Sequence, residues 1–178
     1  MIVMSKYIQE IITNDNLVWE KSLENEPQKF LCKLPESVID ELKKNISKPN
    51  FNDCELVLLK REIENLKKKF LNQGIGFFII EGTIFSSFSQ LEMEKIYKKI
   101  SNLLGSLYEQ NIKKEKFVEI KDLGESMDTG GRYHQTKDGG SYHTDSPQWK
   151  NVPDYIGLYC VSSAKKGIWK SINRKIKK

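Results

Sequence analysis

Cysteine is scarce in this sequence, and the three cysteines lie far apart along the chain. Cys32, Cys54 and Cys160 are odd in number and form no Cys-x-x-Cys pair. A disulfide framework and a structural zinc site are therefore not expected. The low cysteine content fits a reducing compartment, and we expect a cytoplasmic protein.

Long apolar runs are also lacking. No stretch reaches the length of a membrane-spanning helix, and the N-terminal residues lack the apolar core of a signal peptide. With 178 residues, of which 38% are hydrophobic and 30% are charged, the chain has the composition of a globular protein of one-domain size. We expect no membrane partner.

Acidic residues are absent from the C-terminal segment 165–178, which holds seven lysines and arginines. The whole chain has a net charge of +5, but without these seven residues 22 basic residues stand against 24 acidic ones, a net charge of −2. The excess positive charge therefore belongs to a tail. We expect no specific nucleic-acid partner, with non-specific contact as the alternative for such a tail.

The spacing of apolar residues predicts two helices in the first part of the chain. Residues 35–46 begin with proline and carry an apolar stripe on one face. A second helix follows over residues 56–70, with Asn52 and Glu55 as its candidate capping box and Gly74 as its end. Its apolar seam favours packing on a sheet over a short coiled coil. The seam consists of Leu56, Leu59, Ile63, Leu66 and Phe70.

A third helix and several short strands are predicted further along. Ser89 and Glu92 have the spacing of a capping box, and Gly105 is positioned to end the helix that they open. Short runs rich in apolar and β-branched residues indicate strands. These runs cover residues 75–80, 117–120 and 155–161, and a polar, glycine-containing loop is expected over residues 122–131.

The clearest chemical signal lies between Gly139 and Val161. His143 and Asp145 are two positions apart, so on an extended strand their side chains point to the same face. An imidazole and a carboxylate directed at one point suit a non-haem Fe(II) site of two histidines and one carboxylate, which keeps positions open for substrate and oxygen. A His-x-Asp pair recurs by chance, but here a double glycine precedes it, and Ser-Pro, Val-Pro and the apolar run 155–161 follow it.

The residues around this pair carry a more specific pattern. It consists of Arg132-Tyr133-His134-Gln135-Thr136, Gly139-Gly140, His143-Thr144-Asp145 and residues 153–161. The pattern resembles the first metal-binding half of the taurine dioxygenase-like (TauD/TfdA) family of Fe(II)- and 2-oxoglutarate-dependent oxygenases. The resemblance implies an oxidoreductase that hydroxylates a small-molecule substrate, with Fe(II) as cofactor and 2-oxoglutarate as co-substrate. It also implies an α+β fold, namely the front part of a double-stranded β-helix of the jelly-roll type with N-terminal helices.

The resemblance assigns roles to individual residues. It implies that His143 and Asp145 bind Fe(II) as a neutral imidazole and a carboxylate. For His134 we favour a polar pocket residue over a recruited third ligand, and for Trp149 packing is the alternative to substrate contact. The candidate pocket residues are Arg132, His134, Thr136 and Trp149.

The family pattern also includes residues that this sequence lacks. The family completes its metal triad with a distal histidine and holds 2-oxoglutarate with a distal arginine, but no histidine follows His143, and neither Arg132 nor Arg174 stands at the arginine position. Gly167 stands where the family has the first of two glycines, which are followed by a variable residue and then by a serine or threonine. This chain continues instead with Ile168-Trp169-Lys170, so the second glycine is missing and a lysine stands at the hydroxyl position. We therefore expect a truncated and inactive copy, produced by a frameshift or a premature stop.

The sequence thus predicts an N-terminal arm over residues 1–34, a partial oxygenase domain over 35–167 and a basic tail over 168–178 that is out of frame under the frameshift hypothesis. A jelly roll needs about eight strands to cover its edges, and we find roughly three or four. Open edges and exposed apolar surface are expected.

The alternative function is a non-catalytic interaction module that uses the 56–70 seam or the basic tail. The sequence identifies neither the primary substrate nor the oligomeric state.

Overall fold

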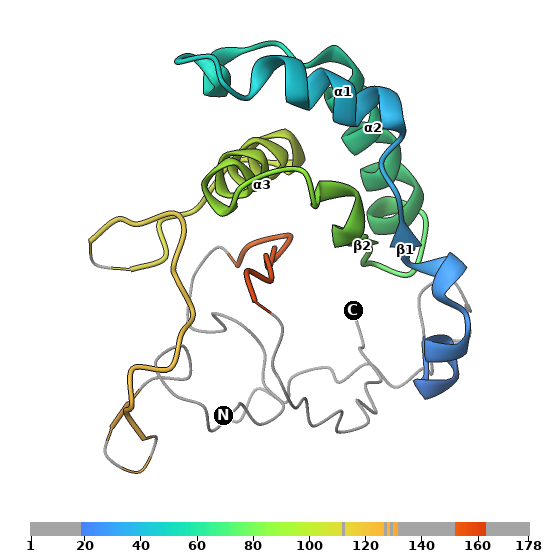
Figure 1. Cartoon of the computed structure of the whole chain (residues 1–178). Coiled ribbons are helices and arrows are strands. Elements are labelled where there is room, and N and C mark those ends of the chain that lie inside the picture. Colours follow the sequence, from blue (N-terminus) through green and yellow to red (C-terminus); the bar gives the residue numbers. More distant parts are fainter. Residues whose placement is uncertain (1–18, 112, 127, 129, 132–151, 163–178) are drawn as a thin grey trace, which may run out of the picture. The chain divides into compact units, whose positions relative to one another are not determined.

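The computed structural model describes residues 19–162, except 112, 127, 129 and 132–151 (Figure 1). The chain divides into two compact units, Met1–Gly105 with Tyr159–Lys178, and Ser106–Leu158. All helices and strands assigned in the described residues belong to the first unit. None of the helices in these residues has the length and apolar content needed to cross a membrane.

Helix α1 spans Glu36–Asn45 and confirms the first predicted helix. It begins directly after Pro35, whose φ of −58° leads the chain into the helix. Glu36 lies in the first turn and two lysines lie in the last, which suits the helix dipole. The predicted apolar stripe is buried, and it consists of Val38, Ile39, Leu42 and Ile46.

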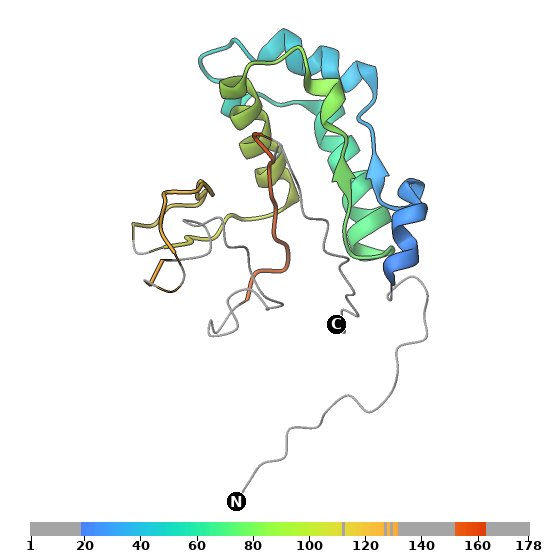
Figure 2. The same cartoon turned by 60° about the horizontal axis from the view of Figure 1, so that its bottom comes forward.

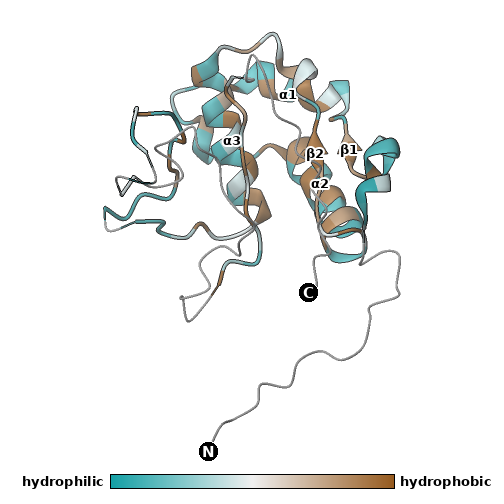
Figure 3. Cartoon of the chain, turned by 90° about the horizontal axis from the view of Figure 1, so that it is seen from below, coloured by the Kyte–Doolittle hydropathy of each residue, from teal (hydrophilic) through white to brown (hydrophobic). Residues whose placement is uncertain are grey.

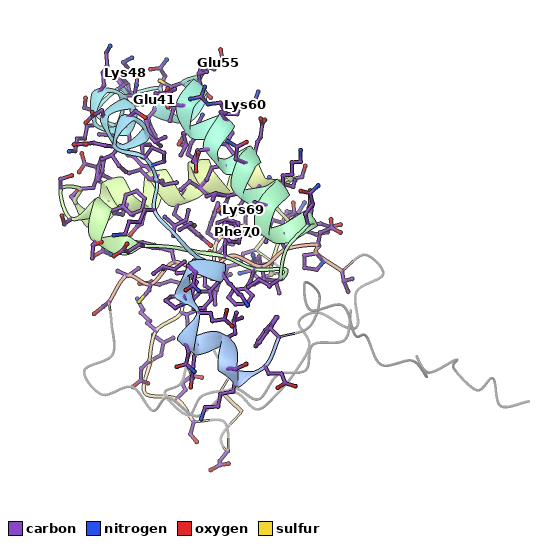
Figure 4. The ribbon with its side chains drawn as sticks, turned by 90° about the vertical axis from the view of Figure 1, so that its right-hand side faces the viewer. Glu41, Lys48, Glu55, Lys60, Lys69 and Phe70 are labelled. Carbon is purple, nitrogen blue, oxygen red and sulfur yellow. The ribbon has the colours of Figure 1, made fainter. Side chains whose placement is uncertain are left out.

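Helix α2 spans Val57–Leu66 and continues as a π-helical segment, Lys67–Asn72 (η4). Every residue of the predicted seam is buried. The predicted capping box is wrong, because Asn52 lies in a separate 3-10 turn, Phe51–Asp53 (η3), and α2 has no side-chain cap of its own. Near the end of the helix, the ammonium of Lys69 lies 4.8 Å from the centre of the Phe70 ring (Figure 4).

Helix α3 spans Gln90–Leu104. The predicted capping box is confirmed, since the backbone N–H of Ser89 donates to the Glu92 carboxylate at 2.8 Å and the Ser89 hydroxyl accepts from the Glu92 N–H at 3.4 Å. Gly105 ends the helix as expected. The sequence therefore marks both ends of α3 correctly.

A small parallel sheet joins two distant segments. Strand β1 (Leu31–Cys32) pairs with β2 (Ile79–Ile80), with Leu31 opposite Ile79 and Cys32 opposite Ile80 (Figure 2). Helices α1 and α2 lie between the two strands along the chain, which supplies the crossover that parallel pairing requires.

Only the last two residues of the predicted strand 75–80 pair in this sheet. The residues before them turn back onto the end of η4, where the Gly76 N–H donates to the Phe70 carbonyl at 2.9 Å and Gly76 has a φ of +88°. A side chain at Gly74 would have its Cβ only 2.5 Å from the Lys69 carbonyl oxygen. This close turn prevents the first part of the segment from extending.

The core of the first unit lies between the three helices. Its most completely buried side chains belong to α1, η3, α2 and α3, and Figure 3 shows apolar and polar residues on different sides of these helices. The sheet covers part of the same core through Cys32 and Ile80, and Phe78, directly before β2, packs against the core as well. The Lys67 ammonium donates to the Leu104 carbonyl at 2.7 Å and so ties the start of η4 to the end of α3. The largest fully buried residues are Phe51, Leu42, Leu59, Ile63 and Ile96.

Short 3-10 turns complete the first unit. Two of them, Lys21–Asn25 (η1) and Pro27–Lys29 (η2), precede β1 in the segment that the sequence predicts as an irregular arm. The Phe77 ring contacts the rings of Trp19 and Phe30, with centroids 5.4 and 5.6 Å apart. A further turn, Gly82–Phe85 (η5), connects β2 to the approach of α3.

The described part of the second unit consists of turns and extended chain. No strand is assigned to residues 117–120, and none to residues 155–161, which run from the second unit into the first. Both strand predictions are therefore wrong for this structure. A short apolar run becomes a strand only when a neighbouring strand completes its ladder, and none is assigned beside either segment in the described residues.

Candidate metal centre

The six residues that the sequence singles out for the site lie outside the described part of the chain. All of them fall between residues 132 and 151. The structure therefore neither brings them together nor separates them, and their roles stay predictions. They are the metal-ligand candidates His143 and Asp145 and the pocket candidates Arg132, His134, Thr136 and Trp149.

The segment that leads into this stretch is a tightly turned loop. The Gly124 N–H donates to the Asp122 carboxylate at 2.8 Å, and Gly124 has a φ of +77°. The Gly131 N–H donates to the Ser126 carbonyl at 2.9 Å, next to Gly130 with a φ of +90°. The polar, glycine-containing loop expected over residues 122–131 is thus present where the structure describes it. Gly124 and Gly130 adopt positive φ angles that other residues rarely reach.

The segment that follows the stretch exposes apolar side chains. Val152, Ile156, Leu158 and Val161 are all more than half exposed, and Leu158 reaches 79%. The sequence predicts this run as a buried strand, so its exposure is a second departure from the prediction. A jelly roll that lacks strands would leave such residues open, and the observed exposure is compatible with an incomplete fold.

Tyr159 is the member of this segment that packs against a helix. Its ring stacks on that of Tyr97 in α3, with centroids 5.6 Å apart and planes inclined by 29°. Burial raises the pKa of both phenols, and for Tyr159 the nearby Glu94 carboxylate adds to the effect. No spacing rule in the sequence could have linked these two residues, which lie 62 positions apart.

The donor chemistry fits an Fe(II) centre in part. An imidazole and a carboxylate are two of the three protein ligands in a non-haem Fe(II) site of the two-histidine, one-carboxylate type. Among the described residues, no group of three or more histidine, cysteine, aspartate or glutamate side chains is placed to hold a metal ion. The candidate ligand set is therefore the pair His143 and Asp145, and the third position has no assigned residue.

The structure also bears on the alternative of an interaction surface. The 56–70 seam is buried, with Leu59 and Ile63 completely inaccessible, and α2 packs against α1 and α3. A partner could reach this seam only if the first unit opened. The basic tail lies outside the described residues.

Comparison with known proteins identifies one family. The model described as "Taurine catabolism dioxygenase TauD, TfdA family" matches residues 40–167. The match covers most of the chain and includes α2, α3, His143 and Asp145. The corresponding comparisons found no matching curated protein and no matching solved structure.

Proposed function

The chain belongs to the TauD/TfdA dioxygenase family, and on this premise we propose that it carries the first part of a non-haem Fe(II)- and 2-oxoglutarate-dependent dioxygenase site. The observation that supports the proposal is the family match across residues 40–167, which contains the His143-Thr144-Asp145 sequence. The proposed reaction is the hydroxylation of a small molecule.

His143 and Asp145 would hold the metal ion in this proposal. His143 binds through a neutral imidazole nitrogen, so metal affinity falls when acid protonates the ring. Asp145 supplies a carboxylate whose negative charge offsets part of the metal charge. When bound, Fe(II) couples the oxidative decarboxylation of 2-oxoglutarate by oxygen to oxidation of the substrate.

The pocket candidates would act on the organic molecules. The Arg132 guanidinium can hold a carboxylate through two parallel hydrogen bonds, and the Thr136 hydroxyl can donate one more. The two ring nitrogens of His134 can donate and accept hydrogen bonds. Trp149 offers a flat apolar surface for a substrate.

We further propose that these 178 residues are inactive by themselves. No histidine follows His143 in these residues, and Arg174 does not stand at the family's co-substrate position. A third metal ligand and a co-substrate arginine would have to come from outside these 178 residues. We also propose a cytoplasmic location, which the free thiols of Cys32, Cys54 and Cys160 support.

The test combines metal binding with turnover. Under anaerobic conditions, Fe(II) is titrated into the chain and into Asp145→Ala, with Asp154→Ala as the matched control because Asp154 is an exposed aspartate near the same stretch. We expect Asp145→Ala to lose roughly 10-fold or more in affinity and the control to match the unaltered chain. Succinate release from 2-oxoglutarate should be absent in all three.

Two results would contradict the proposal. Equal Fe(II) affinity of the chain and Asp145→Ala would remove the metal assignment. Succinate formation by the isolated chain that depends on both Fe(II) and oxygen would overturn the proposed inactivity.

A further inference from the structure

The small parallel sheet of the first unit has one covered face and one open face. On the covered face, Cys32 and Ile80 pack against the core. Leu31 and Ile79 lie opposite each other in the two strands and point the other way, because side chains alternate along a strand. They are 37% and 49% exposed. Each strand therefore presents one apolar residue on the open face.

An ion pair follows the two strands on the same face. Lys33 and Glu81 each come two positions after the exposed residue of their strand, so the alternation directs them to the same side. The strand pairing continues up to this point, since the Glu81 N–H donates to the Cys32 carbonyl at 2.9 Å. The Lys33 ammonium lies 3.1 Å from the Glu81 carboxylate, and the two side chains are 69% and 25% exposed. The open face thus combines apolar side chains with one positive and one negative charge.

An open face is unusual for parallel strands. Parallel sheets in folded proteins are covered on both faces, whereas antiparallel sheets tolerate water on one side. Here each strand is only two residues long, so the ladder itself supplies few hydrogen bonds. Among the described residues, no third strand is assigned beside β1 or β2. A cover on the open face would remove apolar surface from water at a place where the sheet has little other support.

The two charges indicate which cover fits this face. Around a two-fold axis the same surface of two copies meets itself, and each contact occurs twice. A face with one positive and one negative side chain is complementary to itself in this arrangement, because Lys33 of each copy can reach the partner's Glu81. A wholly positive or wholly negative partner would instead bring one of the two charges against its like, which is unfavourable.

We propose that the chain forms a two-fold dimer through the open face of the sheet. Leu31 and Ile79 form the apolar centre of this interface, and Lys33 and Glu81 form its charged rim. The inference goes beyond the proposed function and does not depend on it, since every residue of the interface belongs to the first unit and none takes part in the metal site.

Sedimentation of the full chain in the analytical ultracentrifuge tests the dimer. We expect a monomer–dimer equilibrium between about 1 and 500 µM protein, a range that brackets micromolar dissociation constants. A chain that stays monomeric over the whole range would overturn the proposal, because the open face would then be covered by other residues of the same chain or by nothing.

A lysine in the apolar centre tests the position of the interface. Ile79→Lys should raise the dissociation constant roughly 10-fold or more, because a charge replaces an apolar side chain that the dimer buries. Leu158→Lys is the matched control, since Leu158 is 79% exposed and belongs to the other compact unit. It should dimerise like the unaltered chain. If Leu158→Lys weakens the dimer as much as Ile79→Lys or more, the interface lies elsewhere and the proposal is overturned.

A charge exchange tests the two-fold pairing. Lys33→Glu makes the charges of the face wholly negative, and Glu81→Lys makes them wholly positive. Each variant alone should dimerise roughly 10-fold more weakly, because like charges meet across the axis. An equimolar mixture should form a mixed dimer at least as tightly as the unaltered chain. Both variants lack the ion pair within the chain, so the mixture isolates the contact between chains. A mixture that associates no better than the separate variants would overturn the pairing.

Discussion

The carboxylate of Glu41 in α1 accepts a hydrogen bond from the backbone N–H of Leu59 in α2, with oxygen and nitrogen 2.9 Å apart. Its other oxygen accepts from the Leu58 N–H at 3.1 Å. Because α2 has no side-chain cap of its own, Glu41 satisfies two amide groups that the helix cannot satisfy. Its negative charge also suits the positive end of the helix dipole. Figure 4 shows Glu41 in α1, close to the start of α2.

Replacing Glu41 with alanine should destabilise the first unit. We expect the free energy of unfolding to fall by about 1–2 kcal/mol, because two amide groups lose their acceptor at a partly buried helix end. Chemical denaturation measures the change. Asp40→Ala is the control, since Asp40 is an exposed carboxylate on the same helix. If Glu41→Ala and Asp40→Ala lower the free energy of unfolding by the same amount, the hydrogen bonds of Glu41 contribute nothing beyond the effect of removing a negative charge from α1.

Replacing Ile63 with alanine should have a larger effect. Ile63 is completely buried between the helices, so the variant loses apolar burial and leaves a cavity that costs about 2–5 kcal/mol. Val57→Ala, at a position that is 58% exposed in the same helix, should change stability by less than about 0.5 kcal/mol. If the seam served a partner instead of the core, Ile63→Ala would lower the free energy of unfolding by as little as Val57→Ala does.

The cysteines should differ in reactivity. Burial raises the pKa of Cys32 from 9.0 to about 11, whereas Cys160 is exposed. Because the thiolate is the reactive form, iodoacetamide at pH 8 should label Cys160 well before Cys32. Mass spectrometry of digested protein measures the order, and faster labelling of Cys32 would contradict the burial of its side chain.

The same raised pKa has a consequence for stability. The folded state favours the neutral Cys32 thiol over the thiolate. The stability that this preference contributes is fully present below pH 9 and is lost as the pH rises towards about 11. Cys32→Ser, which ionises far less readily, should reduce the fall in stability across this window. An unchanged alkaline profile would show that Cys32 does not contribute to it.

The capping box of α3 should be visible in the titration of Glu92. Hydrogen bonds from the Ser89 backbone and side chain lower the pKa of this carboxyl group. Stabilisation from Glu92 is therefore present above the pKa of the unfolded chain and is lost as the pH falls through the folded pKa. In Ser89→Ala, NMR titration should show the Glu92 pKa move upward. An unchanged pKa would contradict the side-chain contribution.

Local patterns predicted the helices well. The stripe from Val38 to Ile46, the seam from Leu56 to Phe70 and the box of Ser89 and Glu92 all depend on residues within a few turns of one another. In a helix, residues three and four positions apart lie on the same face, so these patterns can be recognised from the local sequence alone. The cap of α2 could not be predicted, because Glu41 reaches it from another helix, 17 and 18 positions away.

The strands were predicted less well because pairing depends on distant partners. Residues 75–80 pair only at Ile79 and Ile80, where β1 lies beside them. Residues 155–161 have the composition of a buried strand but are largely exposed. The metal stretch itself, with His143 and Asp145, lies outside the described residues, so its predicted geometry stays a prediction.

The most direct test of the account is the Fe(II) affinity of two histidine variants, His143→Ala and His134→Ala, measured by anaerobic titration. The account predicts that the unaltered chain binds Fe(II), that His143→Ala loses roughly 10-fold or more in affinity, and that His134→Ala stays close to the unaltered chain. These are the only two histidines in the sequence, so each variant is the control for the other. An affinity that depends on His134 and not on His143 would contradict the assignment of the metal site.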